Sequence, residues 1–99
     1  MTRAETIRES LGREFAPQDL RVDDQSARHA GHAGARPEGE THFHVHIVSA
    51  QFAGLSRVER QRRIYAALAG EFDTGLHALT LTALTPQEQV LRAASPSAR

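Results

Sequence analysis

The chain has no cysteine among its 99 residues, and this absence removes several kinds of chemistry. Without cysteine there is no disulfide framework, no zinc ribbon and no thiol nucleophile. An iron–sulfur cluster held by the chain's own thiolates is excluded as well. Any redox chemistry therefore needs a group that another molecule brings.

Long apolar runs and net charge are also missing. No stretch approaches the roughly 20 apolar residues of a membrane-spanning helix, and the first ten residues, MTRAETIRES, are too charged for a leader with an apolar run. We therefore expect a cytoplasmic protein that does not bind membranes. Twelve basic residues balance twelve acidic ones, so the molecule as a whole does not attract nucleic acid electrostatically.

Sequence signatures of catalysis are absent too. There is no Gly-x-Ser-x-Gly elbow, no phosphate-binding glycine loop and no pair of carboxylates on a recognisable pocket-forming framework. Since a cysteine nucleophile is also missing, we expect a binding protein rather than an enzyme. The length suits one hydrophobic core, so we assign residues 1–94 to a single domain and residues 95–99 to a flexible C-terminal tail.

Three helix starts share one local pattern, the capping box. In each, a hydroxyl side chain is followed three residues later by a glutamate, and the two residues satisfy free backbone N–H groups at the helix start. The three pairs are Thr2–Glu5, Ser56–Glu59 and Thr85–Glu88. Apolar residues at helical spacing follow the first two starts, and Pro86 occupies the first helical position of the third. The sequence predicts helices at about 3–14, 57–71 and 86–93.

Alternating apolar and polar residues predict three strands between these helices. Leu20 and Val22 mark the first, residues 41–49 the second and residues 77–84 the third. The first two strands can pair antiparallel, whereas the third follows a helical crossover and should run parallel to its neighbour. The predicted fold is α/β (α+β): a small three-stranded mixed sheet with helices packed on one face, in the order α-β-β-α-β-α.

The second strand carries a histidine at every second position. His42, His44 and His46 therefore share one face, about 6.6–6.8 Å apart, and two such imidazoles can in principle chelate zinc. A closed site needs further ligands, however, and the residues between the histidines are apolar. We interpret the histidine side as the solvated face of a one-layer sheet and predict no zinc site there. His42 is assigned a local hydrogen-bonding role.

Several signatures in this region, in order, resemble the BolA family. The segment THFHVHIVSAQFAGLSRVERQRRIYAALAGEF, followed by GLHALTLTALTPQE, has a His-Phe strand, a Phe-x-Gly, an arginine-rich helix reaching Tyr65, and a His-Ala-Leu strand before Thr-Pro. The resemblance runs from the first helix to about Glu88 and implies a fold like the class II KH domain. One departure is Gln61, because many relatives have Arg-His-Arg where this chain has Arg-Gln-Arg.

The resemblance also implies a function and a set of ligands. BolA proteins typically bind monothiol glutaredoxins and share a [2Fe-2S] cluster with them, so the glutaredoxin cysteine and glutathione's thiol would supply half of the ligands. His77 matches the family's ligand in the His-Ala-Leu segment. A second ligand comes from the loop between the first two strands, and here either His29 or His32 is a candidate. By spacing alone, each of these residues is a surface histidine.

An arginine cluster offers a second function. Arg57, Arg60, Arg62 and Arg63 lie on the predicted helix 57–71, and such a cluster usually marks a solvated or partner-facing side. BolA proteins have also been regarded as DNA-binding regulators, so we keep DNA binding as the alternative. A KH-type RNA reader would need a Gly-x-x-Gly loop between two helices, and the chain has none there. A homodimer in the absence of glutaredoxin is left open.

Overall fold

The computed structural model describes residues 2–25 and 42–93. The predicted loop ligands His29 and His32 and the predicted tail at residues 95–99 lie outside these ranges. Within the described ranges the elements follow in this order: α1 (Arg3–Phe15), β1 (Asp19–Asp24), β2 (His42–Val48), a 3-10 turn (Ala50–Phe52), α2 (Arg57–Ala67), α3 (Ala69–Asp73), β3 (Ala78–Leu84) and α4 (Pro86–Ala93). The predicted α+β class is confirmed.

The three strands form one mixed sheet in the order β1-β2-β3. β1 pairs antiparallel with β2, whereas β2 pairs parallel with β3, in a register that joins His42 to Ala78 and Val48 to Leu84. Both predicted strand directions are confirmed. Because β2 and β3 are parallel, their first residues lie at the same edge of the sheet.

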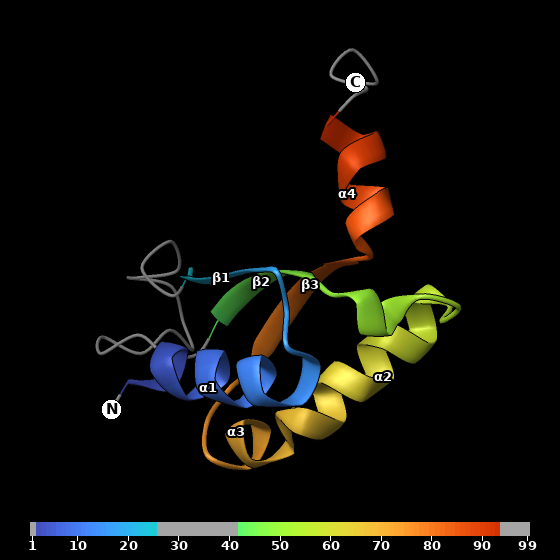
Figure 1. Ribbon diagram of the computed structural model, residues 1–99. Helices are drawn as coiled ribbons and strands as arrows, with labels where there is room; N and C mark the ends of the chain where they lie inside the picture. Colours follow the sequence, from blue (N-terminus) through green and yellow to red (C-terminus); the bar gives the residue numbers. More distant parts are fainter. Residues whose placement is uncertain (1, 26–41, 94–99) are drawn as a thin grey trace.

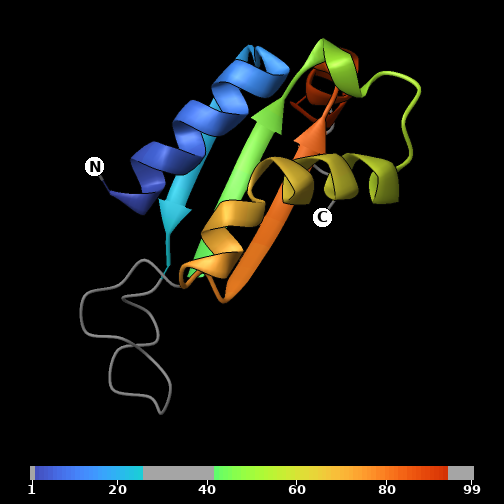
Figure 2. The same ribbon diagram turned by 90° about the horizontal axis from the view of Figure 1, so that it is seen from below.

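Three helices cover one face of this sheet. Figure 1 shows α1, α2 and α3 in a layer beneath the strands, and Figure 2 shows α1 running alongside the strands and α2 crossing them. The prediction of helices on one face holds for these three. It does not hold for α4, which leaves the end of β3 and projects from the opposite side of the sheet (Figure 1).

The core lies between the sheet and this helix layer. Phe43, Val45 and Ile47 of β2 are at most 2% exposed, as are Ile7 and Leu11 of α1. Complete burial of one such side chain stabilises the fold by about 1.5–3 kcal/mol. The alternation seen in the sequence therefore fixes which side of β2 faces the helices, and it places the three histidines on the other side.

All three predicted capping boxes are present. The Thr2 and Ser56 hydroxyls accept hydrogen bonds from the glutamate N–H three residues on, and each glutamate side chain accepts one from the cap residue's N–H. At α4, Thr85 N–H donates to Glu88 at 2.9 Å, and Glu88 N–H donates to the Thr85 hydroxyl at 3.2 Å. The helix starts were thus readable from local sequence.

The predicted helix 57–71 is in fact two helices. The chain bends at Leu68, whose backbone lies at φ −108° and ψ 16°, so α2 ends at Ala67 and α3 begins at Ala69. Leu68 itself is 1% exposed, and the rings of Tyr65 and Phe72 remain in contact across the bend with centroids 5.1 Å apart. Since the apolar spacing continues through the bend, periodicity could not reveal it.

The sequence prediction also missed the 3-10 turn after β2. The buried Ser49 hydroxyl donates to the Phe15 carbonyl at 2.7 Å and accepts a hydrogen bond from Gln51 N–H at 3.1 Å. The hydroxyl thereby connects the end of α1 to the start of the turn. Among the described residues, no helix combines the length and the apolar character that crossing a membrane requires.

Candidate functional site

The first residues of β2 and β3 bring two histidines together. His42 pairs with Ala78, so His77, which immediately precedes β3, lies beside it. The two ring centroids are 6.2 Å apart and the ring planes meet at 74°. His77 is exposed and His42 is half-buried. In the sequence, His42 groups with His44 and His46. Its closeness to His77 follows only from the pairing of β2 with β3.

The connection that carries His29 and His32 starts and ends at this edge. Gln25, just after β1, donates its backbone N–H to the His42 carbonyl at 2.7 Å. Residues 26–41 therefore leave and re-enter the described structure beside His42, as Figure 2 shows for the ends of β1 and β2.

The backbone before His77 is held by α1. Arg3 donates to the Glu71 carboxylate at 2.8 Å and to the backbone carbonyls of Glu71 and Thr74 at 3.2 and 2.9 Å. Leu76 N–H donates to the Glu71 carbonyl at 2.9 Å, and the Leu76 side chain is 3% exposed. The turn passes through Gly75 at φ 128°, a conformation that favours glycine. His77 thus follows a fixed turn although its ring is exposed.

His44 and His46 have neighbours on the adjoining strands. His44 Nδ1 and the Thr80 hydroxyl share a hydrogen bond of 2.7 Å. His46 Nε2 lies 3.7 Å from an Asp19 carboxylate oxygen, and its side chain is 19% exposed. Burial lowers the pKa of His46, and the negative charge of Asp19 opposes this effect only partly. The histidines therefore lie on the side of the sheet away from the helices, as predicted, but His44 and His46 are only half-exposed.

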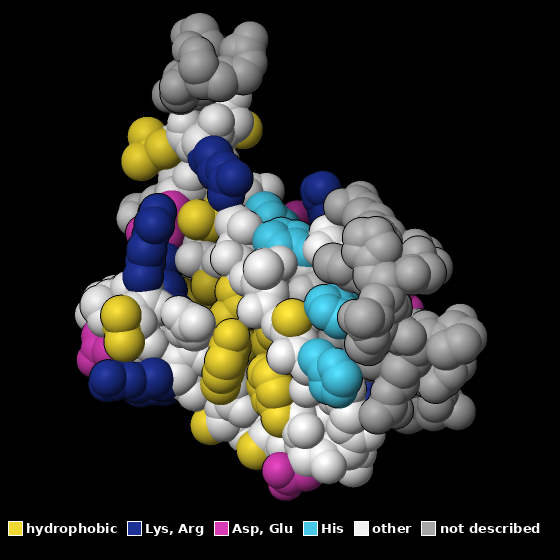
Figure 3. Space-filling view, turned by 180° about the vertical axis from the view of Figure 1, so that it is seen from behind, with side chains coloured by type: hydrophobic (Ala, Val, Ile, Leu, Met, Phe, Trp, Pro, Cys, Tyr) yellow, Lys and Arg dark blue, Asp and Glu magenta, His cyan; other side chains and the backbone are white. Residues whose placement is uncertain are grey.

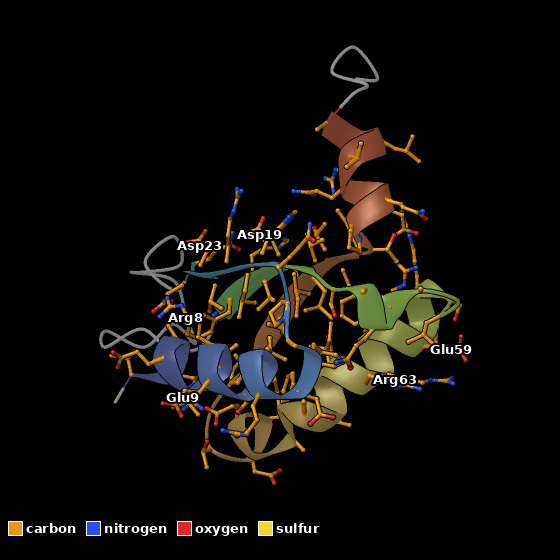
Figure 4. The ribbon with its side chains drawn as sticks, in the orientation of Figure 1. Arg8, Glu9, Asp19, Asp23, Glu59 and Arg63 are labelled. Atoms are coloured by element: carbon orange, nitrogen blue, oxygen red, sulfur yellow. The ribbon has the colours of Figure 1, made fainter. Side chains whose placement is uncertain are left out.

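The outer face of the sheet combines these histidines with two carboxylates. Figure 3 shows histidine side chains following one another along this face, and Figure 4 shows Asp19 and Asp23 rising from β1 on the same side. Within residues 2–25 and 42–93, no group of three or more histidine, aspartate or glutamate side chains could hold a metal ion. The prediction that His44 and His46 form no zinc site stays a prediction.

Arg60 differs from the other three arginines of the predicted cluster. It is 7% exposed, and its Nε and Nη1 donate to the carbonyls of Leu55 and Ala83, each at 3.0 Å. Nη1 and Nη2 also donate to the two Glu88 carboxylate oxygens at 2.6 and 3.1 Å. These bonds from Arg60, with help from the Thr85 N–H, lower the pKa of Glu88 to about 2.

The prediction that Arg60 belongs to a partner-facing surface is therefore corrected. Its guanidinium is buried because it joins α2, β3 and α4. Arg57, Arg62 and Arg63 are exposed, and Figure 4 shows Arg63 pointing away from the body of the protein. A groove of about 470 Å³ lies between α2, the second half of β3 and α4, with Arg57 and Arg92 among its lining residues.

Known proteins are similar to this chain in sequence and in fold. The family described as BolA-like protein matches residues 11–88. Protein BOLA1, chloroplastic, of Arabidopsis thaliana is 49% identical over 88 residues, which are 87% of this chain and 55% of the relative. SufE-like protein 1, chloroplastic/mitochondrial, of the same plant is 48% identical over 88% of this chain and 24% of its own length. This chain thus spans about half and about a quarter of these two relatives.

Other relatives match over most of their length. The protein named DNA-binding transcriptional regulator BolA, from Haemophilus influenzae, is 35% identical over 89% of this chain and 82% of its own. The solved structure of BolA1 from Arabidopsis thaliana has a TM-score of 0.80 and 47% identity over 89% of this chain and 96% of that one. The BolA domain of SufE1 from the same plant has a TM-score of 0.79 and 48% identity, with the same shares of the two chains covered. From the matched residues, the identity and the shared fold, the chain belongs to the BolA-like protein family.

Proposed function

We propose that the protein binds a [2Fe-2S] cluster jointly with a monothiol glutaredoxin and glutathione. His77 is one ligand from this chain, and His29 or His32 is the other. One observation supports this assignment most directly: the exposed His77 ring lies at the edge where residues 26–41 leave and re-enter the sheet. A ligand on this segment therefore lies on a connection that joins the described structure at His42, beside His77.

The ligand chemistry explains why a partner is needed. The chain has no thiol, so it supplies imidazoles, and the glutaredoxin cysteine and glutathione supply the two thiolates. A cluster held in this way carries electrons at a higher potential than an all-thiolate cluster. This chain's residues bind and orient: the turn fixed by Arg3 positions His77, and neutral imidazole nitrogens hold iron.

The role we infer is binding rather than catalysis. Cluster assembly, cluster transfer and iron sensing all need a protein that holds a cluster between two chains and releases it. We place this role in the cytoplasm, where thiols stay reduced, because glutaredoxin and glutathione must both present free thiols.

Co-expression with a monothiol glutaredoxin from the same source tests the proposal. We expect a stable heterocomplex with visible absorption and circular dichroism of a histidine-ligated [2Fe-2S] cluster. His77→Ala should reduce the cluster content and change the spectrum, whereas the paired change His44→Ala and His46→Ala should leave both unaltered. A complex whose cluster spectrum is unchanged by His77→Ala would rule out His77 as a ligand.

The two loop histidines are compared in the same complex. Each single change, His29→Ala or His32→Ala, should have the smaller effect, because a neighbouring loop imidazole can replace the one removed. The double variant should resemble His77→Ala. An unaltered cluster in the double variant would exclude the loop as the source of the second ligand.

DNA binding is a second candidate, favoured by one observation. Arg57, Arg62 and Arg63 are exposed on α2, and one relative carries the name of a DNA-binding regulator. If this candidate is correct, a defined duplex should bind with submicromolar affinity at physiological salt. Plotting the logarithm of the binding constant against the logarithm of the salt concentration gives a slope. Replacing the three arginines with alanine should make this slope less steep by about 0.9 for each phosphate that is no longer neutralised. Arg60 is left intact, because its replacement would disturb the fold. Absence of salt-dependent binding would remove the candidate.

A further inference from the structure

The pairing of β2 with β3 places an additional imidazole, that of His42, beside the proposed ligand His77. The ligand set proposed above leaves His42 out. We propose that His42 and His77 together bind one divalent transition-metal ion, of the class that imidazole prefers, in the protein without its partner. This site extends the proposed function because it uses His77, but metal binding by the isolated chain does not require glutaredoxin.

The distance between the rings suits one shared ion after a small adjustment. With metal–nitrogen bonds of about 2.0–2.1 Å, an ion lies about 3 Å from the centre of each ring, which sets two centroids on a tetrahedral ion about 5 Å apart. The observed separation is 6.2 Å, and the rings meet edge to face at 74°. One ring must therefore turn and approach by about 1 Å for both nitrogens to face the ion.

His42 and His77 differ in how freely their rings can move. His42 lies in the central strand and is half-buried, so its ring has little room to move. His77 precedes β3, and its ring is exposed while its backbone follows the turn that Arg3 holds. Exposed side chains change rotamer on a picosecond to nanosecond timescale. His77 can therefore turn toward His42 without any movement of the sheet.

The other histidines of β2 are less suitable. They lie farther along the sheet from His77, because His44 pairs with Thr80 and His46 with Thr82, whereas His42 pairs with Ala78. Because the described part of the chain provides no third ligand, a metal held by His42 and His77 would keep coordination positions open for water.

Metal titration of the isolated, metal-free full chain tests the pair. Zinc chloride in calorimetry should show one ion per chain, and Cu²⁺ in electron paramagnetic resonance should show nitrogen hyperfine structure from two imidazoles. His42→Ala and His77→Ala should each weaken binding by about tenfold or more. The double variant His44→Ala with His46→Ala is the matched control and should bind as the wild type does.

A further variant separates metal binding from ring packing. His42→Phe keeps an aromatic ring against His77 but removes both nitrogens. We expect a folded protein, as circular dichroism reports, and metal binding weakened as in His42→Ala. Unchanged metal affinity in His42→Phe, or loss of binding in the control double variant, would overturn the proposal.

The two proposals fail in different experiments. If the wild-type glutaredoxin complex carries no cluster while the isolated chain still loses metal with His42→Phe, the cluster proposal is wrong and the metal site stands. If the complex carries a His77-dependent cluster while His42→Phe binds metal normally, the metal site is wrong and the cluster proposal stands.

Discussion

Polar side chains near the two ends of β3 differ in burial and in the number of their hydrogen-bond partners. Where β3 leads into α4, the buried Arg60 guanidinium donates hydrogen bonds to the Glu88 carboxylate and to the carbonyls of Leu55 and Ala83. Before the first residue of β3, His77 presents an exposed ring beside another imidazole. A charged residue with many internal partners serves the fold, whereas an exposed polar ring on a fixed backbone is available to a ligand. Residue type alone would have placed Arg60 on the surface with the other arginines of α2.

Replacing Arg60 is the strongest test of this contrast. Arg60→Ala should lower the free energy of unfolding by about 3 kcal/mol, because it removes a guanidinium that joins three elements and leaves carbonyl groups unsatisfied. Arg62→Ala, on the exposed side of the same helix, should change it by less than about 0.5 kcal/mol. Urea unfolding followed by circular dichroism measures both. Equal effects would show that burial does not distinguish these arginines.

Replacing Arg3 tests whether the backbone near His77 is fixed. Arg3→Ala removes the ion pair with Glu71 and the bonds to the Glu71 and Thr74 carbonyls, so we expect a loss of about 1–2 kcal/mol in unfolding free energy. Amide exchange at Leu76 should become faster. Exchange that stays as slow as in the wild type would mean that the turn does not depend on Arg3.

We expect acid to lower the stability that Glu88 contributes near the end of β3. The folded-state pKa of Glu88 is about 2, below its ordinary value of 4.5. Its stabilising effect is therefore complete above about pH 4.5 and is lost as the pH falls toward 2. The carboxylate side chain is 42% exposed, so after allowance for solvent screening we expect a contribution of about 1 kcal/mol. The free energy of unfolding, measured with urea at a series of pH values, should depend less on pH over this range for Glu88→Gln than for the wild type.

The smallest effect on stability is expected at the other end of β3. His77→Ala should change the unfolding free energy by less than about 0.5 kcal/mol, because the ring is exposed. Thermal unfolding of the isolated chain measures this. A loss of about 1.5 kcal/mol or more would assign His77 to the fold and would weaken the interpretation of its cluster phenotype as removal of a ligand.

Local patterns in the sequence predicted most of the fold. Capping boxes gave the helix starts, and alternation on β2 gave the core face of the sheet, because each depends on residues only two to four positions apart. The bend at Leu68 was not predictable, since the apolar spacing continues across it. Long-range partners were not predictable either: Arg60 meets Glu88 through the docking of α4, and no pattern within α2 contains that information.

The candidate site divides in the same way. His77 was identified by family resemblance, and its role as a ligand stays a prediction. The closeness of His42 to His77 depends on which residue of β2 faces which residue of β3, and a single sequence does not specify that register. His29 and His32 lie outside the described residues, so the choice between them rests on the loop variants.

The parallel pairing of β2 and β3 also has a consequence in time. His42 pairs with Ala78 and Val48 with Leu84, a constant separation of 36 residues. At a synthesis rate of about 5–20 residues per second, β3 leaves the ribosome roughly 2–7 seconds after β2. During that interval the edge of β2 that later pairs with β3 is unpaired, and an unpaired strand edge is a template for pairing with another chain. The newly made protein is therefore most prone to aggregation during those seconds, before β3 closes the sheet.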